Sequence, residues 1–115
     1  MQYLLLMWGD GSGPEPSPPD DSGEPCWMPW VREMDERGVR LPAGGRLELA
    51  TMPAAVRVQD GETLLTDGPF AETKEQMAGY QVIECASRDE AIYAASRHPV
   101  ATSGGIVEVR ELFHE

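Results

Sequence analysis

Apolar and polar side chains follow two different periods in the first third of the chain. Residues 3–8 form a nearly continuous apolar run, Tyr-Leu-Leu-Leu-Met-Trp. A run of this length is typical of a short strand that is buried on both faces. Four later apolar side chains stand at positions i, i+3, i+4 and i+7, as on one face of a helix: Trp27, Trp30, Val31 and Met34. This spacing predicts an amphipathic helix over residues 28–37.

In the middle of the chain the pattern changes to alternation. Residues 46–49 and 56–59 each alternate apolar and polar side chains, which predicts two half-buried strands. Asp60-Gly61 separates the second of these strands from residues 63–66, Thr-Leu-Leu-Thr. A type I′ turn needs positive φ at both central positions, which aspartate and glycine tolerate. The sequence therefore predicts a β-hairpin here.

The last third repeats the order strand, helix, strand. Residues 79–85 predict a strand, and Ser87 begins a capping box that predicts the start of a helix. Because the residue before a proline avoids the helical conformation, we expect Pro99 to end this helix at His98. Residues 106–113 alternate again and predict the closing strand.

The order of these elements predicts an α+β fold of the split βαβ type, with an extra hairpin in the middle. An antiparallel sheet with both helices on one face would bury both amphipathic helices in one core. The other face of the sheet would then be uncovered. We therefore expect a homodimer that closes sheet against sheet.

Composition limits the class of protein. The chain has 115 residues, enough for a single domain over residues 1–115. Its 20 acidic and 9 basic residues give a net charge of -11, which disfavours nucleic acid and anionic membranes as partners. No long apolar run or signal peptide is evident, so we expect a soluble, cytoplasmic protein. Residues 9–25 are rich in proline, glycine and acids, and predict a loop insertion that is either a lid or, as we favour, a solvated excursion.

The most unusual stretch is residues 67–75, Asp-Gly-Pro-Phe-Ala-Glu-Thr-Lys-Glu. Asp67-Gly68-Pro69 predicts a tight turn. Lys74 is the only lysine of the sequence and stands between two glutamates. It is either a ligand anchor or proton donor, or one side of a surface ion pair that holds the loop.

With this motif the sequence resembles the YCII-related family, specifically its DGPF branch. Gly79-Tyr80, Arg97-His98-Pro99 and Glu108-Val109-Arg110 extend the resemblance over nearly the whole chain. It implies a ferredoxin-like domain that dimerises as a dimeric α+β barrel. It also implies a superfamily rich in cofactor-free enzymes that act on small acids and aromatic breakdown products. Members of the DGPF branch occur with sigma-factor systems, which suggests a regulatory alternative.

The shorter relatives carry a histidine in their first helix that has been proposed as catalytic, and residues 27–37 contain none. His98 is the remaining candidate. In the last turn of its helix, where the dipole would favour the protonated ring, it is either a general acid/base or a capping residue that binds the final carbonyls. Cys85 is expected to be a small core residue. Glu111 and His114 would not converge on a metal from a strand.

Two hypotheses follow. The first is a cofactor-free and metal-free lyase or isomerase that acts on a small carboxylate or enolisable compound. His98 or Asp67 would move the proton, and Lys74 or Arg110 would hold negative charge. The remaining candidates are expected to contact the substrate: Phe70, Tyr80, Trp30 and Glu108. For Glu108 and Arg110 a cross-strand ion pair is the alternative. The second hypothesis is a non-catalytic ligand-binding or regulatory module.

Overall fold

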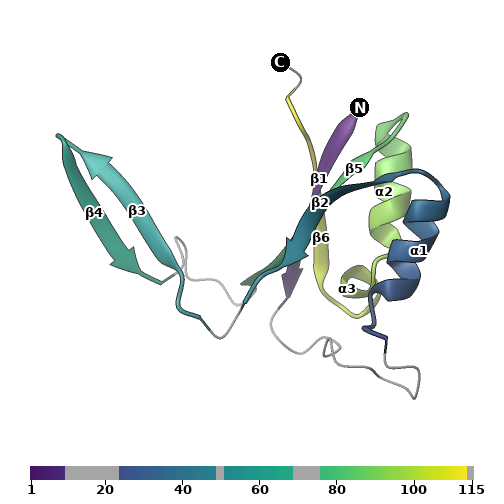
Figure 1. Cartoon of the computed structure of the whole chain (residues 1–115), viewed down its shortest axis with the longest axis horizontal. Coiled ribbons are helices and arrows are strands. Elements are labelled where there is room, and N and C mark those ends of the chain that lie inside the picture. Colours follow the sequence, from purple (N-terminus) through teal and green to yellow (C-terminus); the bar gives the residue numbers. More distant parts are fainter. Residues whose placement is uncertain (10–23, 49–50, 69–75, 114–115) are drawn as a thin grey trace.

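The computed structural model describes residues 1–9, 24–48, 51–68 and 76–113, and it shows one antiparallel sheet with the helices on a single face (Figure 1). In chain order the elements are β1 (Gln2–Gly9), α1 (Met28–Glu36), β2 (Arg40–Arg46), β3 (Ala54–Gln59), β4 (Glu62–Asp67), β5 (Gln76–Glu84), α2 (Arg88–Ser96), α3 (Pro99–Thr102) and β6 (Ile106–Glu111). The sheet has the strand order β2-β5-β1-β6, and β3 pairs with β4 in a separate hairpin. The predicted α+β, ferredoxin-like architecture is confirmed.

Strand β1 lies in the centre of the sheet and separates its two faces. Tyr3, Leu5 and Met7 are buried under the helices, whereas the alternate residues of the strand are half-buried on the open face: Leu4, Leu6 and Trp8. Burial on both faces is therefore not complete within one chain. Ile83 of β5 lies opposite Tyr3 and is fully buried, so both central strands contribute to the core.

The two longer helices form largely as their local signals predict. Helix α1 begins at Met28 and ends at Glu36, and Gly38 follows with φ 70°, which glycine adopts without strain. At the start of α2 the Ser87 hydroxyl accepts a hydrogen bond from the Glu90 N–H at 3.2 Å. The alanine side chains of this helix are buried against the core: Ala91, Ala94 and Ala95. In the described ranges no helix is long and apolar enough to cross a membrane.

The region after α2 differs from the prediction. Helix α2 ends at Ser96, and Pro99 does not only stop it but begins the short helix α3. Proline suits this position because its φ is already helical and its missing N–H would have no partner in a first turn. His98, in extended conformation, is the N-terminal cap of α3.

The second predicted strand is also displaced. We predicted it over residues 46–49, but β2 ends at Arg46 and Leu47 lies beyond it, and residues 49–50 lie outside the described ranges. Between Arg40, opposite Ile83, and Gly44, opposite Gln81, the register of β2 shifts in a bulge. Local alternation missed this strand because its centre consists of proline, alanine and glycine, which have low strand propensity.

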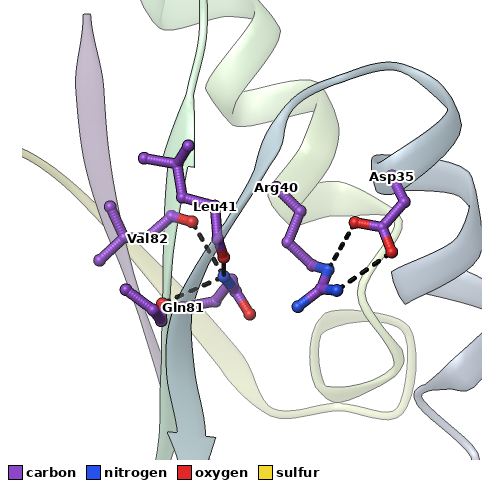
Figure 2. Close-up of polar contacts among 6 residues, drawn as sticks. Asp35, Arg40, Leu41, Gln81 and Val82 are labelled. Carbon is purple, nitrogen blue, oxygen red and sulfur yellow. Dashed lines mark hydrogen bonds and ion pairs between the residues drawn. The ribbon is translucent and has the colours of Figure 1, made fainter.

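A buried amide holds this bulge in place. Figure 2 shows the side chain of Gln81 between β5 and β2, where its Nε2 donates to the carbonyls of Leu41 at 2.7 Å and Ala43 at 3.1 Å. A Cβ at Gly44 would lie 2.6 Å from the Oε1 of Gln81, so only glycine leaves room for the amide. In the same view the Arg40 guanidinium donates twice to the Asp35 carboxylate, which lowers the pKa of Asp35 and ties β2 to the end of α1.

Replacing Gln81 by leucine should lower the free energy of unfolding by about 1–2 kcal/mol, because two carbonyls of the bulge lose their donor. Urea denaturation followed by circular dichroism measures this change. Gln2→Leu, at an exposed position at the start of β1, is the matched control and should change stability by less than about 0.5 kcal/mol. Equal stability of Gln81→Leu and the wild type would show that the bulge does not depend on the amide.

The predicted hairpin is confirmed. Strands β3 and β4 are joined by Asp60 and Gly61, with φ values of 53° and 79°, which are the two positive angles that a type I′ turn requires. The expectation that these strands are half-buried is wrong for the single chain, since Val56 and Val58 are exposed. In Figure 1 the hairpin projects away from the sheet and its helices.

Candidate functional site

His98 and Trp30 lie together under the helices, on the covered face of the sheet. Both side chains are buried, and their rings meet edge to face with centroids 4.9 Å apart. The Trp30 Nε1 donates to the Ala94 carbonyl at 2.8 Å, which joins α1 to α2. The His98 Nδ1 accepts the N–H of Val100 at 3.1 Å, so the ring carries its proton on Nε2.

The charge state of His98 differs from the expectation. We expected the helix dipole to favour the protonated ring, but burial lowers the pKa of His98 to about 4. Protonation would also remove the lone pair of Nδ1 that accepts from Val100. The ring is therefore neutral at neutral pH, and it caps the N-terminus of α3 rather than the carbonyls at the end of α2. Its role as a general acid or base stays a prediction.

Glu108 and Arg110 lie on the opposite, open face of the sheet. Glu108 is paired with Leu6 and Arg110 with Leu4, and these leucines alternate with the residues of β1 that are buried under the helices. The Glu108 carboxylate accepts the Nε1–H of Trp8 at 3.2 Å. Its other oxygen lies 4.0 Å from a guanidinium nitrogen of Arg110, so the predicted ion pair exists, but within one strand and not across two.

Tyr80 belongs to the same face. Leu6 lies between Tyr80 of β5 and Glu108 of β6, so the three residues form a row across the sheet. The two ends of such a row are about 10 Å apart. A small ligand could therefore lie over Leu6 and contact both ends. The open face thus combines an apolar floor, a carboxylate, a guanidinium and a phenol.

The turn motif is described only at its start. Asp67 is the exposed last residue of β4, and Gly68 donates its N–H to the Pro53 carbonyl at 2.6 Å and has φ 114°. This φ favours glycine because a side chain would be strained there. Phe70 and Lys74, and with them the rest of the motif, lie outside the described residues. The predicted loop over residues 9–25 also lies largely outside them.

The structure divides the predicted site residues among separate places. It brings Glu108, Arg110 and Tyr80 to the open face, and His98 and Trp30 to the covered face, while Asp67 lies in the hairpin.

Two further observations concern Cys85 and metal ligation. Burial raises the pKa of the Cys85 thiol to about 11, as a small core residue requires. Within the described part of the chain no group of three or more His, Cys, Asp and Glu side chains could hold a metal ion.

Trp8 is the residue that sequence reasoning missed. The apolar run identified its strand, and alternation would have placed Trp8 on the face of Leu4 and Leu6. The pairing of β1 with β6, which brings the indole to Glu108, joins residues a hundred positions apart. No local pattern fixes that register.

Comparison with known proteins gives two findings. The family model of the YCII-related domain matches residues 1–114. An uncharacterised protein of Rhizobium meliloti (strain 1021) is 42% identical to this chain over 127 aligned residues, which cover 97% of this chain and 92% of that protein.

Proposed function

The chain belongs to the YCII-related domain family, and on this premise we propose that it is a homodimeric, cofactor-free enzyme that binds a small carboxylate on the open face of its sheet. The reaction is a proton transfer next to the carboxylate, as in a lyase or isomerase. The observation that carries the proposal is the grouping of Trp8, Glu108 and Arg110 on an apolar surface.

Each of these three side chains has a part in the proposed chemistry. The guanidinium of Arg110 presents parallel N–H groups to a substrate carboxylate. The ion pair with Glu108 is long and its side chains are partly exposed, so a ligand can take its place. The Trp8 N–H holds one oxygen of Glu108 and leaves the other to accept a proton. Tyr80 lies at the other end of the row, across Leu6 from Glu108.

In this proposal a second copy of the chain covers the open face. The open face presents mostly apolar side chains: Leu4, Leu6, Val82 and Ile106. Covering this face with the same face of a second copy would bury them and exclude water from the site. Charges attract one another more strongly once water is excluded, so the site works only between two subunits.

The catalytic roles predicted for His98, Asp67 and Lys74, substrate contacts of Phe70 and Trp30, and membership of the DGPF branch are kept as proposals. His98 and Trp30 would serve a ligand only from the covered face, which is remote from Glu108.

Replacing Arg110 by glutamine should weaken the binding of small carboxylates about tenfold or more, because a charged hydrogen-bond partner is lost. A panel of aliphatic and aromatic acids screened by ligand-observed NMR identifies the class that binds. Arg88→Gln, which removes an exposed arginine from the start of α2, is the matched control and should bind as the wild type does. Unchanged affinity in Arg110→Gln would contradict the proposal.

The same samples in D₂O test catalysis. We expect the wild type to exchange the proton next to the carboxylate of a bound acid, and Glu108→Gln to slow this exchange about a hundredfold. If His98→Asn, and not Glu108→Gln, abolishes the exchange, the proton acceptor is His98. Binding without exchange in the wild type would favour the non-catalytic ligand-binding module.

A further inference from the structure

The β3–β4 hairpin has one mainly apolar face that nothing in the described chain covers. Val56 lies opposite Leu65, Val58 opposite Thr63 and Ala54 opposite Asp67, so these six residues share that face. Val56, Leu65 and Val58 are 64%, 65% and 67% exposed. The opposite face carries mainly polar and small side chains: Ala55, Arg57, Gln59, Glu62, Leu64 and Thr66. The hairpin therefore has one mainly apolar side and one mainly polar side. In the single chain the apolar side is exposed to solvent.

A hairpin of this kind is poorly stable without support. An isolated two-stranded sheet is marginal in water, because it buries too little apolar surface to offset the entropy of ordering its residues. Here the turn is nevertheless specified by Asp60-Gly61 with positive φ at both positions. The sequence specifies the turn and places Val56 and Val58 on one face. It therefore predicts a folded hairpin that packs on another surface.

The arm leaves the molecule next to the face that the proposed dimer buries. It is inserted between β2, which ends at Arg46, and β5, which begins at Gln76 opposite Gly9. Trp8 lies at this same end of β1. Figure 1 shows the hairpin extending outward from this end of the sheet. The hairpin thus follows the end of the sheet at which Trp8 lies, and it forms no strand pairs with that sheet.

The open face alone offers less area than a stable dimer buries. This shortfall points to a second copy as the surface that covers the arm. Four strands of about six residues present about 400 Å² on one face, whereas a stable interface buries about 800 Å² per partner. One face of the hairpin presents about 200 Å². In a two-fold dimer each subunit would bury its open face, one face of its own arm and an equal area that receives the partner's arm. Together these surfaces amount to about 800 Å² per subunit.

We propose that the β3–β4 hairpin is an intersubunit arm whose Val56, Val58 and Leu65 face packs on a second copy of this chain. This proposal rests on the homodimer of the proposed function. The arm adds to the sheet interface and keeps its Arg57 face in solvent. Both arms engage at once, because two-fold symmetry repeats every contact.

Sedimentation equilibrium of the full chain tests the arm. The variant Val56→Thr/Val58→Thr/Leu65→Thr keeps good strand formers but removes the apolar face, and should raise the dimer dissociation constant about tenfold or more. Leu64→Thr, on the opposite face of the same hairpin, is the matched control and should leave the constant within about twofold of the wild type. A wild-type dissociation constant in the triple variant would overturn the arm.

Leu6→Glu, in the centre of the open face, separates the two proposals. If Leu6→Glu dissociates the dimer and the triple variant does not, the sheet interface stands and the arm is overturned. If only the triple variant dissociates it, the arm stands and the sheet interface fails. A monomeric wild type overturns both.

Hydrogen exchange of the wild type avoids dependence on variants. We expect the amides of residues 54–67 to exchange faster when the protein is diluted below its dissociation constant, because the arms are then released. Exchange of these amides that does not change with concentration, in a protein that does dissociate, would also overturn the arm.

Discussion

Replacing Trp30 by alanine is expected to lower the free energy of unfolding by about 3–5 kcal/mol. The indole is 4% exposed, contacts the ring of His98 and bonds the Ala94 carbonyl, so its removal leaves a cavity where α1, α2 and α3 meet. Urea denaturation measured by far-UV circular dichroism gives the change. A loss of this size is a large part of the stability of a domain of this length.

Trp30→Phe separates packing from the hydrogen bond. Phenylalanine retains most of the apolar volume but removes one of two donors to the Ala94 carbonyl, which also accepts the Arg97 N–H at 3.3 Å. The loss should cost about 0.5–1.5 kcal/mol. The predicted role of Trp30 as a substrate contact makes the opposite claim. If Trp30→Phe weakens carboxylate binding and retains wild-type stability, the indole serves the ligand and not the core.

Acidification should destabilise the protein through His98. The folded ring titrates near pH 4 because of burial, and its ordinary pKa is 6.5. The unfolded state therefore binds more protons between these values, and stability is lost as the pH falls from about 6.5 towards about 4. The difference in pKa corresponds to at most about 3 kcal/mol. Denaturation midpoints across this range measure the loss.

His98→Asn is the variant that isolates this effect. Asparagine caps helices well but does not titrate, so the variant should lose much of the pH dependence while its packing on Trp30 is weakened at neutral pH. His114→Asn removes the other histidine and should keep the wild-type slope. An unchanged slope in His98→Asn would show that other groups cause the acid sensitivity.

The candidate site was predictable only in part. Alternation correctly placed Glu108 and Arg110 on one face, because successive residues of a strand point in opposite directions. It could not bring Trp8 to Glu108, which depends on how β1 and β6 are paired. For His98 the sequence suggested a cap, but the end that it caps depends on Pro99 starting a new helix.

The elements that the sequence predicts correctly are those with local causes. Positive φ at Asp60-Gly61 specifies the hairpin, the Ser87 hydroxyl starts α2, and apolar spacing around Trp30 selects one face of α1. Tertiary structure decided the position of β2, where the distant Gln81 satisfies carbonyls that no local partner reaches, and the neutral state of His98, which burial imposes. The physical reason is range: turns, caps and periodicity depend on energies between near neighbours, whereas register and burial depend on contacts between residues far apart in the chain.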